Sequence, residues 1–316
     1  MRALTRFQAA SPAENTEDQP EYVSHVAYTP KGDRLVLGTS GGEVLLCDGT
    51  DGTVQRRLPK LPRYVSSLDV GPKGGSLLTV AGGEARLWDL ATGTERHRLE
   101  VGFLSALHFV PDGRSFAECD STRVVRFLDR KSGAVTHRFG RSEPHDHQRQ
   151  NLMTPTSIAF SPDGQRMAMA RWDQAVYVWE LSSGAKVATL PGRLAVQWSP
   201  DGRIIAAATG TISKRASRTA LRLRLFDAAT WQELRTVAEH EPENARFSPD
   251  SSLIATVGDG EIRLWDVARG TLAARVRHPE HVPITVALAP NGRDLATGGR
   301  DGDVVLWRMG GPRSSP

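Results

Sequence analysis

Short apolar runs alternate with turn sequences along the whole chain. Turn sequences built around a recurring Pro, Asp and Gly pattern occur seven times, and a short apolar run precedes and follows each one. They are TPKGD from Thr29, GPKGG from Gly71, VPDGR from Val110, SPDGQ from Ser161, SPDGR from Ser199, SPDSS from Ser248 and APNGR from Ala289. Proline presets φ in a type I turn, Asp or Asn is tolerated next, and glycine accepts the position of positive φ. The pattern predicts short β-strands joined by tight turns.

A second repeated feature is an apolar strand that ends in a large residue followed by a charged one. The seven ends are Cys47-Asp48, Trp88-Asp89, Leu128-Asp129, Trp179-Glu180, Phe226-Asp227, Trp265-Asp266 and Trp307-Arg308. Successive ends are separated by 41, 40, 51, 47, 39 and 42 residues, and a second turn follows six of them. A period of about 40 residues with four short strands in each unit predicts the blades of a β-propeller.

These motifs resemble those of the WD40-repeat family, and the resemblance extends over nearly the whole chain. It is strongest in units two, four, six and seven. Units one, three and five carry Cys47, Leu128 and Phe226 where the family has Trp. The resemblance implies an all-β fold, a single seven-bladed propeller of four-stranded antiparallel blades.

The beginning of the chain is expected to complete the last blade. The seventh unit reaches only three strands by Trp307, and the tail MGGPRSSP cannot form a fourth. The N-terminal RALTRF reads like GAVTHRF (133–139), the fourth strand of unit three. Pairing of residues 2–8 with the last blade would remove an open sheet edge.

The predicted domain therefore covers residues 1–310, and residues 311–316 form a flexible tail. The expected blades are 22–62, 63–102, 103–150, 151–192, 193–240, 241–281 and 282–308, the last with the strand 2–8.

The family resemblance also implies a buried network that links Trp to Ser or Thr, Asp and His within a blade. Unit seven offers Trp307, Asp301, Thr297, and His278 or His281, and unit six offers Trp265, Asp259, Thr256 and His240. Unit four has Asp173 and Trp179, and unit two has Trp88. Because the spacing recurs in equivalent places, a structural role is favoured over a catalytic one. Four arginines, two residues before the Trp position, are expected to be solvated or stacked: Arg86, Arg126, Arg224 and Arg263.

In WD40 proteins one face of loops usually binds partners, and this chain places large side chains there. Tyr22, Tyr64 and Phe103 begin the first strands of blades one to three, and Trp172 and Arg300 fall on the same face. Exposed aromatic residues and arginine are typical anchors of protein interfaces. We predict that these residues bind a partner; the alternative is that they pack on the neighbouring blade.

Three charged segments are further candidates. The long loop 209–224 carries Lys214, Arg215 and Arg218 without an acidic residue, which favours an acidic peptide or a phosphate, unless it is a solvated insertion. The connection 141–155 contains His145 and His147, but two histidines without a third ligand do not predict a metal site. The acidic segment Glu14–Glu21 is expected on the same face as the aromatic residues.

The composition and the absence of known motifs exclude several classes of function. The 316 residues carry a net charge of +4, only two cysteines, and no apolar stretch long enough for a membrane span. No secretory signal and no catalytic or nucleotide-binding motif is present, and the arginine-rich composition suggests a bacterial source. We therefore predict a cytoplasmic, monomeric, non-catalytic scaffold that binds a protein or peptide without a cofactor. The alternatives are a propeller enzyme or a small-ligand or metal binder that uses the central channel, and a weak nucleic-acid or phosphate binder that uses the loop 209–224.

Overall fold

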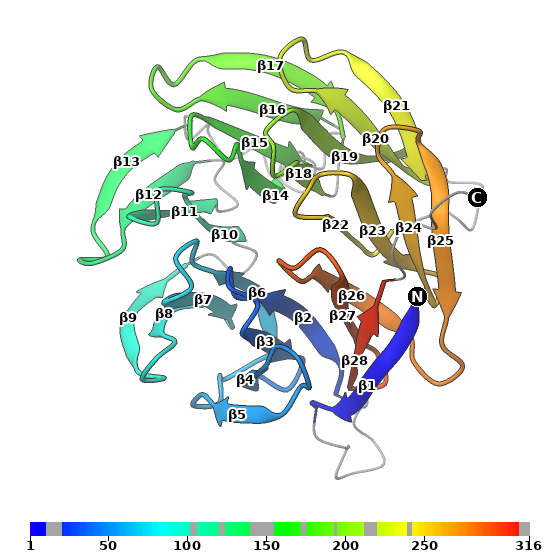
Figure 1. The fold of residues 1–316 in the computed structure, drawn as a ribbon. Helices are drawn as coiled ribbons and strands as arrows, with labels where there is room; N and C mark the ends of the chain where they lie inside the picture. The colour runs from blue at the N-terminus through cyan, green and yellow to red at the C-terminus, as the bar shows by residue number, and fades with distance from the viewer. Residues whose placement is uncertain are drawn as a thin grey trace. The chain divides into compact units, whose positions relative to one another are not determined.

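The structure is a computed structural model. It describes residues 1–10, 21–101, 106–119, 124–139, 155–171, 175–192, 195–211, 220–238 and 242–309. These residues form 28 β-strands, and no helix occurs among them. The strands make seven four-stranded antiparallel sheets (Figure 1), which are the blades of a seven-bladed β-propeller. The predicted fold class is confirmed.

The chain divides into two compact units, each described by itself. Unit 1 contains Met1–Gly82, Trp88–Thr94 and Glu243–Pro316, and unit 2 contains Gly83–Leu87 and Glu95–Pro242. The extent of the predicted domain, residues 1–310, stays a prediction.

Unit 1 holds blades one, six and seven and the first two strands of blade two. Blade one consists of β2 (Val23–Tyr28), β3 (Arg34–Thr39), β4 (Val44–Asp48) and β5 (Val54–Arg57). Blade six consists of β22 (Asn244–Phe247), β23 (Leu253–Gly258), β24 (Glu261–Asp266) and β25 (Thr271–Arg277). Blade seven consists of β26 (Pro283–Leu288), β27 (Asp294–Gly299), β28 (Asp303–Arg308) and β1 (Arg2–Gln8). Blade two begins with β6 (Val65–Val70) and β7 (Ser76–Ala81).

Unit 2 holds blades three, four and five. Blade two continues with β8 (Glu84–Asp89), which is divided between the units, and β9 (Glu95–Glu100) in unit 2. Blade three consists of β10 (Ala106–Phe109), β11 (Ser115–Cys119), β12 (Val125–Asp129) and β13 (Val135–Phe139). Blade four consists of β14 (Pro155–Phe160), β15 (Arg166–Arg171), β16 (Ala175–Glu180) and β17 (Lys186–Pro191). Blade five consists of β18 (Val196–Trp198), β19 (Ile204–Thr211), β20 (Ala220–Asp227) and β21 (Glu233–Ala238).

The Ser-Pro-Asp turns join the first and second strands by the same set of bonds. In blade six the Ser248 hydroxyl donates to Asp250 Oδ1 at 2.6 Å and accepts from the Leu253 amide at 2.9 Å. The Ser251 amide donates to the Ser248 carbonyl at 2.9 Å, and Ser251 has a φ of 62° where most blades have glycine. The turn thus satisfies its own polar groups and starts the second strand in a fixed direction.

The N-terminal strand β1 is the fourth strand of blade seven, as expected from its sequence. It pairs antiparallel with β28, with Ala3 opposite Trp307 and Phe7 opposite Val304. Leu4 lies in an irregularity of this pairing, between Ala3 and Thr5. The bonds of β1 cover the edge of β28 that would otherwise be open.

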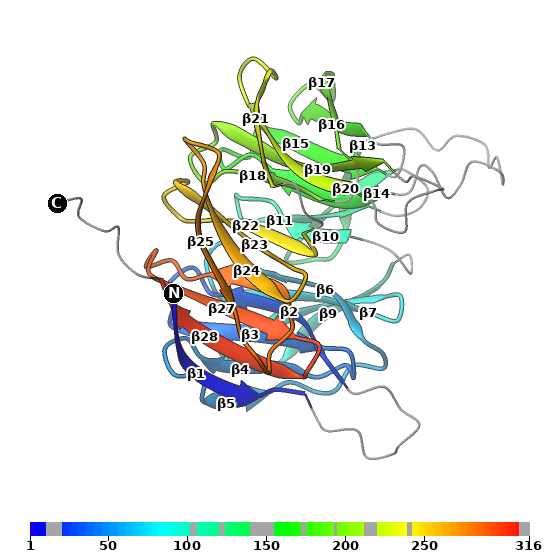
Figure 2. The same ribbon diagram turned by 90° about the vertical axis from the view of Figure 1, so that its right-hand side faces the viewer.

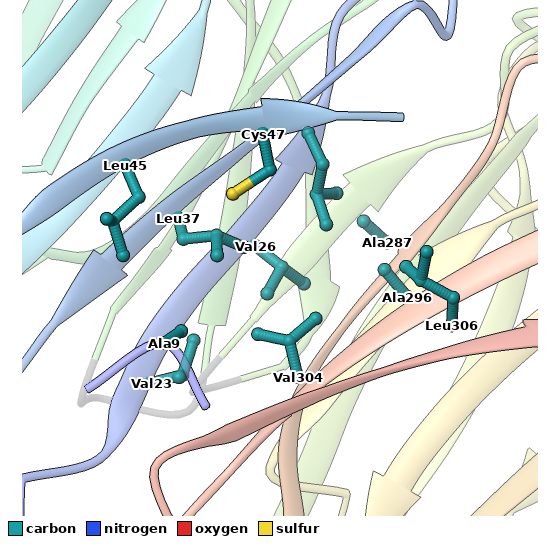
Figure 3. Close-up of a cluster of buried hydrophobic side chains, with 11 residues drawn as sticks. Ala9, Val23, Val26, Leu37, Leu45, Cys47, Ala287, Ala296, Val304 and Leu306 are labelled. Atoms are coloured by element: carbon teal, nitrogen blue, oxygen red, sulfur yellow. The ribbon is translucent and has the colours of Figure 1, made fainter. Parts of the chain in front are cut away.

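A continuous apolar core fills the space between blades seven and one, within unit 1 (Figure 3). Val304 and Leu306 of β28 face Val26 of β2 across this core, and all three are buried. Cys47 occupies the position at which blades two, four, six and seven have Trp, and its side chain is fully buried there. The close packing of many small aliphatic side chains replaces one large ring at this place.

Candidate partner-binding face

Three exposed apolar side chains occupy equivalent positions in consecutive blades of unit 1. Tyr22, Tyr64 and Val282 each come directly before the first strand of a blade, at β2, β6 and β26. Their exposed fractions are 36%, 39% and 44%, respectively. We call these residues, with Arg63 and Arg300, the loop face of unit 1. The sequence indicated Tyr22, Tyr64 and Arg300; Val282 and Arg63 were not singled out, although Val282 precedes its strand in the same way.

Backbone hydrogen bonds hold these positions to the neighbouring hairpins. The Tyr22 amide donates to Ser40 Oγ at 2.8 Å, and the Ser40 amide donates back to the Tyr22 carbonyl at 2.9 Å. In blade seven the Arg300 amide donates to the Val282 carbonyl at 3.0 Å. The backbone at Tyr22 and at Val282 is therefore bonded to the turn that follows the second strand of its blade.

Glycines on the second strands β27 and β3 let the first strand of the next blade come close. A Cβ on Gly38 would lie only 2.9 Å from Val65 Cγ1, and one on Gly298 would overlap Val23 Cγ1. The Ser24 hydroxyl lies 3.0 Å from both the Gly38 and the Val65 carbonyl oxygens, so it links β2 to β6. Blades seven, one and two are thus in direct contact at the strands that follow Val282, Tyr22 and Tyr64, and the three side chains follow one another along the face.

Charged groups border these apolar side chains. Arg300 Nη2 lies 3.1 Å from Glu243 Oε2, and the Arg300 side chain is 64% exposed. Arg63 is exposed, and its guanidinium has no hydrogen bond or carboxylate partner among the residues that the structure describes. The Arg63 stem packs on Gly82, since a Cβ there would lie 3.3 Å from Arg63 Cδ.

Glu21 is the one described residue of the acidic segment that precedes Tyr22. It is half-buried, and its carboxylate covers Gly41 so closely that a Cβ on that glycine would overlap it. The carboxylate therefore lies against the β3–β4 hairpin, next to the aromatic residues.

Blade seven contains a buried hydrogen-bond network beneath this face. Trp307 Nε1 donates to Thr297 Oγ1 at 2.9 Å, and Thr297 Oγ1 lies 2.9 Å from His281 Nε2. His281 Nδ1 lies 2.9 Å from Asp301 Oδ2. Burial alone would raise the pKa of Asp301, but the hydrogen bond and charge from His281 outweigh it, so the pKa lies below its ordinary value.

Of the two histidines considered for this network, His281 makes the bonds and His278 does not. His278 pairs with His281 through an isolated β-bridge and lies edge-on to the Trp307 ring, 5.9 Å between centroids. His281 is buried, whereas His278 is half-buried at the end of β25. The histidine that reaches Thr297 is therefore His281, which lies just before the first strand of blade seven.

Two other tryptophans of the repeat make the same bond to a threonine. Trp88 Nε1 donates to Thr79 Oγ1 and Trp265 Nε1 donates to Thr256 Oγ1, each at 2.9 Å. Asp259 is exposed with a φ of 54°, and its carboxylate lies 4.0 Å from Arg263. His240 and Asp173, the remaining residues suggested for blades six and four, lie outside the described residues.

Blade four lacks the threonine of this arrangement. Trp179 lies opposite Met167 in the β15–β16 pairing, so the position two residues later, held by Thr297 in blade seven, is Met169. Packing replaces the hydrogen bond there, and Trp179 is only half-buried.

The repeated arginines form ion pairs within their blades. Arg86 Nη2 lies 2.7 Å from Glu84 Oε2, and Arg263 Nη2 lies 2.7 Å from Glu261 Oε2. Arg224 pairs with Glu233 and also lies over the Phe226 ring at 5.9 Å, so a stacking contact is added to the ion pair in blade five.

Blade three departs from the others because a carboxylate occupies the threonine position. Glu118 is 1% exposed, and it forms an ion pair with Arg126 on the adjacent strand. Burial of a charge is tolerated only with such a partner. Sequence reasoning did not single out Glu118, although its position two residues after Phe116 in β11 matches that of Thr297.

Several residues suggested by the sequence lie outside the described part of the chain. They are Phe103, Trp172, Lys214, Arg215, Arg218, His145 and His147, together with residues 14–20 of the acidic segment. Within the described ranges, no three His, Cys, Asp or Glu side chains are grouped so that they could hold a metal ion. The same ranges contain no helix that is long and apolar enough to cross a membrane.

Comparison with known proteins shows the repeat family. Residues 145–180, 231–266 and 274–308 each match the WD40 family, described as WD domain, G-beta repeat. The chain is 24% identical over 256 residues to an uncharacterized WD repeat-containing protein of Synechocystis, which covers 65% of this chain and 68% of that protein. It is 28% identical over 196 residues to the guanine nucleotide-binding protein subunit beta of Oryza sativa, covering 58% of this chain and 50% of that subunit.

Much longer proteins share the same repeats. Mouse telomerase protein component 1 is 30% identical over 170 residues, which cover 50% of this chain but 6% of that protein. The chain thus spans only a small part of the telomerase components that it resembles.

Proposed function

We propose that this chain, which belongs to the WD40-repeat family, is a non-catalytic scaffold that binds a protein or peptide partner through the loop face of unit 1. WD40 relatives support a protein-interaction role in general. The residues proposed to make the contact are Tyr22, Tyr64 and Arg300, joined by Val282 and Arg63. Phe103, Trp172, Lys214, Arg215 and Arg218 remain proposed contributors from the sequence.

One observation carries this proposal: two exposed tyrosines occupy equivalent positions in adjacent blades of unit 1, directly before strands that are bonded to each other. Tyr22 and Tyr64 are more than a third exposed, and they directly precede β2 and β6, which Ser24 links. An immobile anchor loses little conformational entropy when a partner binds, so few contacts are needed for useful affinity. Tyrosine and arginine are also among the residues enriched where the binding energy of an interface is concentrated.

The test is capture of partners from a lysate of the source organism, read by mass spectrometry. The wild-type protein is compared with a Tyr22→Ala/Tyr64→Ala variant and with a Val187→Ala/Leu234→Ala control. Val187 and Leu234 are 38% and 43% exposed on β17 and β21, so the control removes a similar exposed apolar area elsewhere. A partner lost with the tyrosine variant and kept with the control supports the proposal. A partner that both variants keep, or that both lose, contradicts it.

The enzyme and nucleic-acid alternatives have no comparable support. No three potential metal ligands are grouped among the described residues, and the loop proposed for a phosphate lies largely outside them. The cytoplasmic location, the bacterial source and the monomeric state predicted from the sequence stay predictions.

A further inference from the structure

The positive charge of the strands is concentrated on the fourth strand of each blade. These seven strands carry eleven Lys or Arg and three Glu, a net charge of +8, whereas the whole chain has +4. The rest of the chain is therefore acidic on balance. A fourth strand is the edge of its sheet, so this charge lies where a partner could reach it.

Within unit 1 this edge charge has no acidic counterpart in the strands themselves. The three fourth strands β25, β1 and β5 contain six arginines and no Asp or Glu. Figure 1 and Figure 2 show these three strands following one another along one side of the unit. Arg6 of β1 reaches Glu280 just after β25 at 2.6 Å, and Phe7 lies against Gly52, just before β5.

Three of the six arginines keep an uncompensated charge. Arg6 has carboxylate partners, and Arg57 and Arg277 lie 3.4 and 3.8 Å from glutamate oxygens. Arg2 and Arg275 are exposed and have no carboxylate partner in the described ranges, and Arg56 bonds only to the Thr92 carbonyl, at 2.8 Å. Each of the three consecutive blades thus presents one guanidinium that has no carboxylate partner among the described residues.

Each of these three strands also carries an exposed aliphatic side chain. Leu272, Leu4 and Val54 are 43%, 42% and 38% exposed on β25, β1 and β5. Arginine on an edge strand hinders pairing of that strand with another chain, and this protection would explain the arginines. Exposed aliphatic residues on the same strands weaken the protection, so it does not explain why arginine and aliphatic side chains are exposed together.

We infer that this surface, the basic side of unit 1, binds an acidic protein segment that also carries apolar residues. It consists of Arg2, Leu4, Val54, Arg56, Leu272 and Arg275. Arginine beside apolar area is typical of a protein interface. A nucleic-acid backbone would use the arginines and would gain little from the leucines and the valine. This surface consists of other residues than the loop face of unit 1, so the two surfaces could be occupied at the same time.

The test measures binding of a fluorescein-labelled peptide in which Glu alternates with Leu, by fluorescence anisotropy at low and physiological salt. An Arg2→Gln/Arg56→Gln/Arg275→Gln variant should bind about tenfold more weakly, because three partly exposed charge pairs are lost. An Arg114→Gln/Arg203→Gln/Arg293→Gln control removes the same charge from exposed turns and should bind within about twofold of wild type. Equal losses in the two variants would show general charge attraction and overturn the inference.

Three further binding measurements test the class of partner and the surface that binds it. A Leu4→Ser/Leu272→Ser variant should weaken peptide binding severalfold, and unchanged binding would contradict an apolar contribution. Double-stranded DNA of mixed sequence should bind more weakly than the peptide; DNA binding that is tighter and lost with the same arginines would replace a protein partner by nucleic acid. The Tyr22→Ala/Tyr64→Ala variant should bind the peptide like wild type, so failure of the loop-face proposal and failure of this one are distinguishable.

Discussion

The guanidinium of Arg6 lies 3.8 Å from the Asp301 carboxylate, which is the same carboxylate that His281 contacts in the buried network of blade seven. Arg6 also pairs with Asp303 and with Glu280, so one side chain of the N-terminal strand joins three segments of the blade. The first strand of the chain is thereby tied to the network by charge as well as by the β1–β28 pairing.

Substitution of Arg6→Gln should lower the free energy of unfolding by about 1 kcal/mol, because a partly exposed network of ion pairs is lost. Deletion of residues 1–9 should have a far larger effect, since it opens the β28 edge and removes Ala9 and Phe7 from the core between blades seven and one. Urea denaturation followed by tryptophan fluorescence measures both. A deletion variant as stable as Arg6→Gln would show that β1 contributes little beyond its charge.

Gly299→Ala should destabilise the protein by about 2–4 kcal/mol. A Cβ on Gly299 would overlap Asp301 Oδ1 and lie 2.6 Å from His281 Cε1, so the methyl group would separate the two partners of a buried bond. Gly75→Ala is the matched control, because a Cβ there meets nothing within 4 Å and the residue does not have a positive φ. Thermal denaturation should show a lower Tm for Gly299→Ala only. Equal Tm values for the two variants would mean that the space left by Gly299 does not contribute to stability.

Trp307→Phe should cost at least about 1 kcal/mol more than Trp179→Phe. Trp307 is fully buried and its indole N–H donates to Thr297. Trp179 is half-buried, and Met169 holds the position of that threonine in its blade. Both substitutions remove the same atoms, so the difference in unfolding free energy isolates the bond and its burial. Equal losses in chemical denaturation would show that the threonine bond contributes nothing net.

The strands and turns were predictable from the sequence because each unit repeats the same local chemistry. Ser248 and Asp250 specify their turn through bonds between near neighbours, so the signal lies within five residues. The role of β1 was predictable as well, because the last unit lacked a strand and the chain began with a sequence that supplied one.

Features that depend on contacts between residues far apart in the chain were harder to predict from the sequence. Sequence spacing left both His278 and His281 open for the network, and only the side-chain contact with Thr297 shows that the ring is that of His281. The Glu118 ion pair was not foreseen, because a buried carboxylate breaks the residue pattern and becomes understandable only beside Arg126. The exposure of Val282 was likewise missed, since valine before a strand usually indicates packing.

Acid should weaken the protein partly through Asp301. Its pKa is lower in the folded protein than the ordinary value of 3.8, so the unfolded chain takes up a proton first as the pH falls. Its stabilising contribution is therefore complete above the ordinary pKa and is lost as the pH falls through the lower, folded value. The difference in unfolding free energy between wild type and Asp301→Asn should shrink from about pH 6 to about pH 3. A difference that stays constant over this range would contradict the sign.

Cys47 should be unreactive in the folded protein. Its side chain is fully buried in the core between blades seven and one, and burial raises its pKa to about 12, so almost no thiolate forms at neutral pH. In a Cys119→Ser background, which leaves one thiol, iodoacetamide should label the native protein far more slowly than the same protein unfolded in urea, because the reagent reaches the thiol only when the core opens. A native rate close to the rate in urea would show an accessible thiol of ordinary pKa instead. Cys47→Ser in the same background should carry no label, which confirms that the signal comes from this core position.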